Sequence, residues 1–190
     1  MENLKDKIAG LTKLPAYAVG DLLDVSTLRE LPKGSFFIRA GEQPRKMAFV
    51  LKGLFRYVYT DDEGNEYTKS FMPAGSFLSS YTSMINGEAS YYAIEALEDS
   101  SVVVFEYEAW QGLRAKDRIW TDLLVTMLER GYGAKERRER ELLLLSAEAR
   151  YQNFCAMYPG LIGRIKQHQI ASFLGIKPES LSRIRKNMDT

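Results

Sequence analysis

The chain has 190 residues, of which 45% are hydrophobic and 27% charged, and its formal net charge is +1. This composition is ordinary for a soluble globular protein and allows one sizeable domain and a small one. The single cysteine excludes an intramolecular disulfide and a cysteine-ligated zinc or iron–sulfur site. The first ten residues carry charges where a signal peptide would be apolar, and no apolar run reaches 18 residues. We therefore expect a cytoplasmic protein without a membrane anchor.

The first half of the chain predicts a helix followed by a β-rich region. The segment NLKDKIAGLTKL has a helical pattern that Pro15 ends or interrupts. From Gly34 to Glu108, short runs rich in Tyr, Phe and Val alternate with turn signals, which favours a sandwich or barrel. The candidate strands are SFFIRA, MAFVLK, LFRYVYT, EYTKSFM, SYYAIEAL and SVVVFEY. The DDEGN sequence between two of these runs predicts a hairpin turn.

A long helix is predicted after Glu108, because turn signals become rare and apolar residues recur at helical spacing up to about Ser146. A helix of about 30 residues would span roughly 45 Å, which exceeds what one small β-domain can cover. We therefore expect it to pack against its copy in a second subunit. The residues expected at this dimer interface are Leu123, Leu124 and Met127. The alternative is two shorter helices folded back on the β-domain.

The last forty residues have the pattern of a helix-turn-helix. Tyr158-Pro159-Gly160 interrupts the chain, Gln167–Leu174 forms a short helix, and Gly175-Ile176-Lys177 supplies the turn. Pro178 suits the first turn of the next helix, where a missing N–H does no harm. The apolar residues that would hold the two helices together are Ile170, Ala171, Leu174, Ile176, Leu181 and Ile184.

The charge distribution points to nucleic acid at this end. Residues 151–190 carry six Lys or Arg and two acids, whereas residues 1–150 carry 20 bases and 23 acids. Arg183 can match guanine, Glu179 can accept from cytosine, and Arg185 and Lys186 suit phosphates. The predicted DNA-binding residues are Gln169, Lys177, Glu179, Ser180, Ser182, Arg183, Arg185 and Lys186. The alternative is a packing hairpin in which Glu179 and Arg183 form an incidental pair.

With these residues in place, nearly the whole chain resembles the Crp–Fnr superfamily of bacterial transcription regulators. The family's β-roll is similar to RAGEQPRKMAFVLKGLFRYVYTDDEGNEYTKSFMPAGSFL, with matching turns at Gly41-Glu42, Leu51-Lys52-Gly53 and Gly75-Ser76-Phe77. Its helix-turn-helix is similar to IASFLGIKPESLSRIRK, through Ile170, Ala171, Leu174, Gly175, Glu179 and Arg183. The LSRIRK ending looks most like members from the Bacteroidetes.

The resemblance implies an α+β fold in three parts. These are an N-terminal double-stranded β-helix (jelly-roll) sensor domain in residues 1–108, a dimerisation helix in 109–146 and a helix-turn-helix domain in 147–190. It also implies a homodimer that places two recognition helices in successive major grooves. The family usually adds a β-hairpin wing, for which the chain leaves no room after the recognition helix, so we expect DNA affinity to depend more on dimerisation.

The sequence departs from the cyclic-AMP-binding members of this family. Those members carry Gly-Glu and Arg-Ser or Arg-Thr pairs where this chain has Ser79-Ser80 and Ser90-Tyr91. Residues 70–113 contain six acids and no Lys or Arg, so a buried cyclic phosphate would lack its compensating cation. Backbone N–H groups could still hold an anion. We expect no specific binding of cyclic AMP or cyclic GMP, and a ligand that is neutral or apolar.

Candidate ligand-pocket residues are Ser79, Ser80, Tyr81, Ser90 and Tyr91. The tyrosines, together with Tyr92, could line a cavity or could belong to the β-roll core with their hydroxyls at its rim. The single histidine, His168, lies at the helix-turn-helix, which excludes a haem or a cupin-type metal site in the β-roll. No GxSxG, P-loop or GxGxxG motif is present. We therefore expect no catalytic residue, metal or cofactor.

Together these patterns predict a homodimeric transcription regulator that binds a palindromic operator and senses an unidentified small molecule. The expected partners are DNA, a second copy of the chain and an effector, with RNA polymerase as a further candidate. The alternative is a small-molecule or cyclic-nucleotide-binding β-roll without sequence-specific DNA function.

Overall fold

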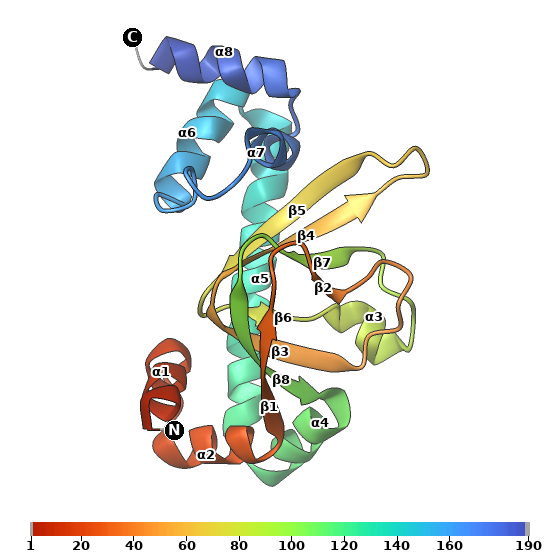
Figure 1. The fold of residues 1–190 in the computed structure, drawn as a ribbon, viewed down its shortest axis with the longest axis vertical. Helices are drawn as coiled ribbons and strands as arrows, with labels where there is room; N and C mark the ends of the chain where they lie inside the picture. Colours follow the sequence, from red (N-terminus) through yellow and green to blue (C-terminus); the bar gives the residue numbers. More distant parts are fainter. Residues whose placement is uncertain (1, 189–190) are drawn as a thin grey trace.

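The computed structural model describes residues 2–188 and consists of a β-roll with helices at both ends (Figure 1). The strands are β1 (Ser26–Leu31), β2 (Phe36–Ile38), β3 (Lys46–Lys52), β4 (Leu54–Thr60), β5 (Glu66–Pro73), β6 (Phe77–Leu78), β7 (Ala93–Ala96) and β8 (Ser100–Glu106). They form two four-stranded antiparallel sheets, in the orders β1-β8-β3-β6 and β2-β7-β4-β5. The expected α+β fold with a jelly-roll domain is confirmed.

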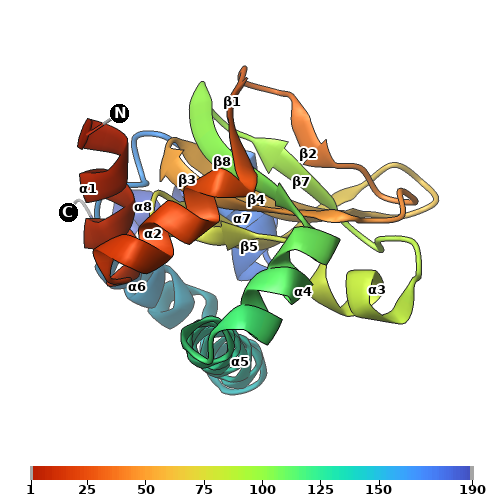
Figure 2. The ribbon, with the colours of Figure 1, turned by 90° about the horizontal axis from the view of Figure 1, so that it is seen from below.

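The helices frame this roll. They are α1 (Glu2–Thr12), α2 (Ala16–Asp24), α3 (Tyr81–Asn86), α4 (Tyr107–Lys116), α5 (Ile119–Leu144), α6 (Ala147–Met157), α7 (Gln167–Leu174) and α8 (Pro178–Met188). Helices α1, α2 and α4 lie at one end of the molecule, and α6 to α8 lie at the other (Figures 1 and 2). Helix α5 runs along the roll and joins the two ends.

All six predicted strand runs form strands, and the predicted first helix is α1. Two strands and two helices in the first half were not predicted, namely β1, β6, α2 and α3. Strand β1 has the sequence STLREL and is largely exposed at the edge of its sheet, so it lacks an alternating apolar pattern. Strand β6 has only two residues.

The prediction of a single helix from Trp110 to about Ser146 is wrong, because the chain breaks into two helices, α4 and α5. Helix α4 ends at Lys116, and Asp117 has extended backbone angles. Its carboxylate accepts a hydrogen bond from the N–H of Ile119 at 2.9 Å, which satisfies a free donor at the start of α5. The remaining helix has 26 residues and is therefore about 39 Å long.

Three hydrophobic clusters hold the molecule together. The first joins α1, α2, α4 and the start of α5 to strands β3 and β8, and it includes the fully buried Trp110 and Trp120. The second fills the space between the two sheets. The third joins β4, β5 and the segment after β7 to α6, α7 and α8. The helix-turn-helix therefore shares a hydrophobic core with the roll.

The turn between β3 and β4 requires glycine at position 53. Gly53 has a φ angle of +111°, and a Cβ atom there would lie 2.0 Å from Ser100 Oγ and 2.8 Å from Ser100 Cα. Gly64, in the β4–β5 hairpin, also has a positive φ angle of +84°, but nothing lies within 4 Å of its would-be Cβ.

We predict that Gly53→Ala lowers the free energy of unfolding by about 3 kcal/mol or more, because left-handed strain and a backbone clash add together. The matched control Gly64→Ala should cost only about 1–2 kcal/mol, from strain alone. Chemical denaturation of the two variants measures both losses. Equal losses would show that the contact with Ser100 does not constrain this turn.

Candidate functional site

The helix-turn-helix is formed by α7 and α8, with Gly175 between them. Gly175 ends α7 in the left-handed conformation at a φ angle of +66°, and the N–H of Ile176 donates to the carbonyl of Ala171 at 3.0 Å. The apolar residues that the sequence placed between the two helices lie in the third cluster. Those fully buried are Ile170, Ala171, Leu174 and Leu181, and those partly buried are Ile176 and Ile184.

Helix α8 lies at the end of the molecule that is remote from most of the roll (Figure 1). Its polar face carries several of the predicted DNA-binding residues. The exposed ones are Glu179, Ser182, Arg183 and Lys186, with Lys177 exposed just before the helix, while Ser180 and Arg185 are half-buried. Neither Glu179 nor Arg183 forms an ion pair within residues 2–188, so both side chains are available to a partner.

Gln169 does not belong to this surface. Its side chain is only 6% exposed, and its Oε1 accepts a hydrogen bond from the N–H of Lys166 at 3.3 Å. It therefore caps the start of α7, in the manner of a capping box, and is removed from the predicted DNA-binding set. The capping role could have been predicted from the sequence, because a Gln at the third position of a helix commonly bonds the backbone N–H of the N-cap residue.

Helix α5 exposes an apolar stripe that differs from the predicted one. Leu124 is 6% exposed and lies in the first cluster, against its own chain, and Leu123 packs against the same cluster. Met127 is half-buried. In the first part of α5 the exposed apolar residues, at helical spacings of three and four, are instead Val125, Leu128 and Tyr132, and a second exposed apolar group, Leu142, Leu143 and Leu144, lies at the end of the helix. The prediction that Leu124 faces a second subunit is therefore wrong.

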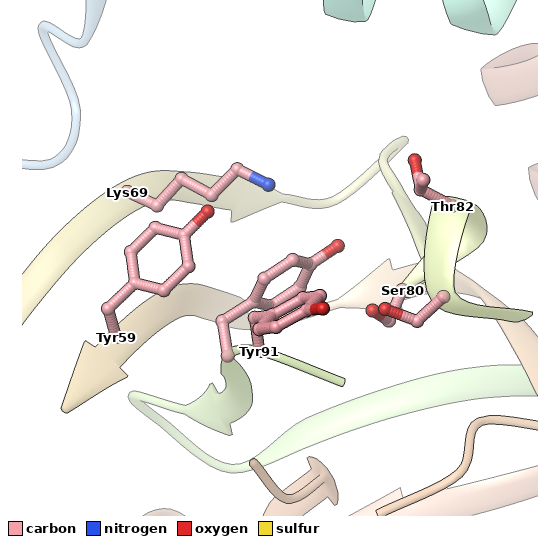
Figure 3. A pocket seen from close by; sticks show the side chains of 7 residues that line it. Tyr59, Lys69, Ser80, Thr82 and Tyr91 are labelled. Carbon is pink, nitrogen blue, oxygen red and sulfur yellow. The ribbon is translucent and has the colours of Figure 1, made fainter. Parts of the chain in front are cut away.

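A pocket of about 420 Å³ opens between β4, β5, α3 and the segment before β7 (Figure 3). Its lining residues are Tyr59, Lys69, Ser80, Thr82, Ser83, Tyr91 and Tyr92. They comprise three aromatic rings, three aliphatic hydroxyls and one cation, with no carboxylate. Of the predicted pocket residues, Ser80 and Tyr91 line it.

The other three predicted pocket residues lie elsewhere. Ser90 is buried behind the lining, where its hydroxyl lies 2.9 Å from Ser80 Oγ and 2.7 Å from the carbonyl of Tyr92. The backbone of Ser79 anchors the tyrosine rings, since its carbonyl accepts from the Tyr92 hydroxyl at 3.2 Å. Tyr81 packs against the first cluster.

Lys69 enters the pocket because β5 carries an extra residue at this point. Tyr57 pairs with Ser70 and Val58 pairs with Thr68, so Lys69 has no residue opposite it in β4. Such a β-bulge redirects side chains. The Lys69 ammonium lies 4.0 Å from the ring centroid of Tyr92 and 5.6 Å from that of Tyr57. Lys69 lies one residue before the stretch 70–113 that lacks Lys and Arg, so the sequence pattern does not place a cation in the pocket.

Strand β5 is an edge strand, and its free backbone groups are taken up by the helices. The Ser172 hydroxyl on α7 accepts from the N–H of Thr68 at 2.8 Å and donates to the carbonyl of Glu66 at 2.9 Å. On α5, Arg138 donates to the carbonyls of Lys69 at 2.7 Å and Phe173 at 2.9 Å. The guanidinium of Arg138 also lies 4.4 Å from the Phe173 ring centroid. Roll, long helix and α7 thus meet at one residue.

Within residues 2–188, no group of three or more His, Cys, Asp and Glu side chains is arranged to hold a metal ion. In the same part of the chain, no helix is both long and apolar enough for a membrane crossing.

Comparison with known proteins identifies the fold. Residues 28–117 match the cyclic nucleotide-binding domain family. No curated protein matches the chain by sequence. Among solved structures, the c-di-GMP-responsive global regulator CLP of Xanthomonas campestris has a TM-score of 0.79 at 15% identity, with 92% of each chain covered.

Two further structures support this assignment. FixK2 of Bradyrhizobium japonicum has a TM-score of 0.77 at 19% identity, with 87% of this chain and 85% of that one covered. A candidate transcriptional regulator of the crp/fnr family from Eubacterium rectale has a TM-score of 0.73 at 17% identity, with 93% and 84% covered. The expected resemblance to the Crp–Fnr superfamily is confirmed at the level of the fold.

We predict that Arg138→Met lowers the free energy of unfolding by about 2–3 kcal/mol, because backbone carbonyls on β5 and α7 lose a charged donor. Amide exchange at Thr68, whose N–H is bonded to Ser172, should accelerate at the same time. Arg140→Met removes an exposed arginine from the same helix. It should change the free energy of unfolding by no more than about 0.5 kcal/mol and leave amide exchange at Thr68 unchanged. Similar effects of the two substitutions would show that the Arg138 contacts do not hold α7 against the roll.

Proposed function

We propose that the chain is a DNA-binding transcription regulator that acts as a homodimer, with α8 as its recognition helix and the β-roll as its sensor domain. The observation that carries this proposal is the exposed polar face of α8, which is held by a rigid turn and projects away from most of the roll. The fold shared with CLP and FixK2 supports it. In this setting we expect a cytoplasmic protein that has no catalytic role and meets RNA polymerase at the promoter.

The residues of α8 have distinct roles in this proposal. Arg183 donates two hydrogen bonds to a guanine, and Glu179 accepts one from a neighbouring cytosine or adenine. Both lie near the start of the helix, where recognition helices in this class of motif contact base edges. Lys186 and the half-buried Arg185 contact phosphates, as Lys177 does just before the helix, and these contacts set position without reading sequence.

The homodimer forms through the exposed stripe of α5. Val125, Leu128 and Tyr132 are exposed apolar or aromatic residues in the first part of α5, before its charged segment AKERRERE, and pairing two copies removes their surface from water. Two-fold symmetry then presents two α8 helices to DNA. The operator should therefore be a palindrome with half-sites about one helical turn, ~34 Å, apart.

A dimerisation test follows from this stripe. Leu128 is 47% exposed, and Leu128→Glu should weaken the dimer at least 100-fold, because two carboxylates would be buried together. Thr126→Glu places the same charge on a different face of α5 and should leave the dimer intact. Sedimentation velocity at tens of micromolar measures the oligomeric state of both variants. Dimers with a binding free energy of about −6 kcal/mol or stronger are detected at this concentration. A monomeric wild-type chain at this concentration would refute the homodimer.

A DNA test separates this proposal from a sensor module without DNA function. Selection from random DNA should return a palindrome for the wild-type chain. Arg183→Ala should cost ~1–3 kcal/mol per half-site and relax the preference at one base position. Lys186→Ala should weaken binding to all sequences and reduce the salt dependence by about one unit of slope.

The same experiment can refute direct readout in two ways. If no palindrome emerges, and genomic DNA does not shift in electrophoresis when the chain is added, the sensor module without DNA function is the better account. If a palindrome emerges but Arg183→Ala and Lys186→Ala behave alike, another element reads the sequence.

A further inference from the structure

The pocket in the roll has an unbalanced charge. Of the described residues that line it, Lys69 is the only cation and none is acidic. Within residues 2–188 the ammonium forms no ion pair, and its contacts are with the rings of Tyr57, Tyr59 and Tyr92. Burial lowers the pKa of Lys69, and the positive charge of Lys135 on α5 lowers it further. A partly buried cation in this state gains from a negatively charged partner.

The neighbouring strand shows what a compensated cation looks like in the same sheet. Arg56 on β4 is buried and contacts two carboxylates, Glu66 and Glu95. Lys69 lies in the adjacent strand β5 and contacts neither of these two carboxylates. The tyrosines do not neutralise it, because burial raises the pKa of both Tyr57 and Tyr92 and keeps their hydroxyls protonated. A negatively charged partner for Lys69 would therefore have to come from outside the described residues.

The tyrosine rings that line the pocket favour a flat, aromatic ligand. Tyr91 is 74% exposed and Tyr59 is 38% exposed; in Figure 3, Tyr59 lies next to Lys69, and Tyr91 lies between this pair and the hydroxyls of Ser80 and Thr82. Exposed rings of this kind favour a ligand that can stack or make an edge contact. Hydroxyls of Ser80, Thr82 and Ser83 supply neutral hydrogen-bonding groups at the far end. A volume of about 420 Å³ is at the small end of the range for ligand pockets.

We propose that this pocket binds a small aromatic carboxylate, with the carboxylate paired to the Lys69 ammonium and the ring lying between Tyr59 and Tyr91. The proposal rests on the sensor role of the roll and specifies the class of molecule that is sensed. It replaces the expectation of a neutral or apolar ligand, which was based on the absence of Lys and Arg from residues 70–113.

The same geometry argues against a cyclic nucleotide in this pocket. Lys69 offers a single point charge, whereas a phosphodiester is best matched by a guanidinium fork. Ser90, at the position where the cyclic-AMP-binding proteins carry arginine, is buried and bonded to Ser80 and to the Tyr92 carbonyl. Its hydroxyl is therefore already used within the protein.

Calorimetric titration of the full chain tests the proposal with three probes: 4-hydroxyphenylacetate, its neutral amide and cyclic AMP. We expect the acid to bind with a dissociation constant below about 1 mM, or −4.1 kcal/mol, and at least 10-fold more tightly than the amide. Lys69→Met should remove this preference for the acid, whereas Lys69→Arg should retain it. Lys46→Met removes a lysine of β3, in the other sheet, whose ammonium lies over the Phe37 ring, and it should leave the preference unchanged.

Several results would overturn the proposal. These are no binding of the acid below about 1 mM, equal binding of acid and amide, or a cyclic AMP dissociation constant near or below ~10 μM. The comparison of acid with amide uses the wild-type chain, so it holds even if a Lys69 variant fails to fold. DNA binding is measured separately. A chain that selects a palindrome but ignores the acid refutes the ligand class alone, and one that binds the acid but no DNA refutes the regulator.

Discussion

The free edge of β5 is the constraint on which the arrangement of the molecule depends. A terminal strand leaves N–H and C=O groups without partners, and in this chain they face the helices instead of solvent. Ser172 and Arg138 satisfy those groups, and the Phe71 side chain of the same strand packs against Phe154 and Phe173. The helix-turn-helix is therefore held by bonds that complete a sheet, which fixes the position of α8 relative to the pocket.

Local patterns predicted most of the fold. Aromatic and β-branched residues predicted six strands, and the apolar residues flanking Gly175 predicted both helices of the helix-turn-helix, because packing in these regions follows the intrinsic preferences of the chain. The failures have physical causes. The exposed edge strand β1 has no buried face to produce alternation. The break before α5 depends on one carboxylate, Asp117, in a stretch that is otherwise helical in character.

The candidate site was less predictable, because its residues are selected by tertiary contacts. Leu124 and Val125 are adjacent and both apolar, and only the position of the first cluster decides which one is buried. Lys69 and Tyr59 reach the pocket from the β4–β5 hairpin, whereas Ser80 and Tyr91 flank α3. No periodicity in a single sequence reports such a convergence. Gln169 is the exception, because its position in the first turn of α7 is sufficient to predict a capping role, although it stands among the predicted DNA-binding residues.

The bulge at Lys69 has a genetic consequence. Without this residue, Ser70 and Thr68 would pair with Tyr57 and Val58 in direct succession, and the ladder would be regular. The chain would lose the ammonium of the pocket and also the carbonyl that Arg138 binds most closely. A deletion of one codon would thus remove the positive charge of the pocket and a bond to α5 in a single step. A substitution of Lys69 would remove the ammonium but keep the backbone carbonyl, so only a deletion removes both.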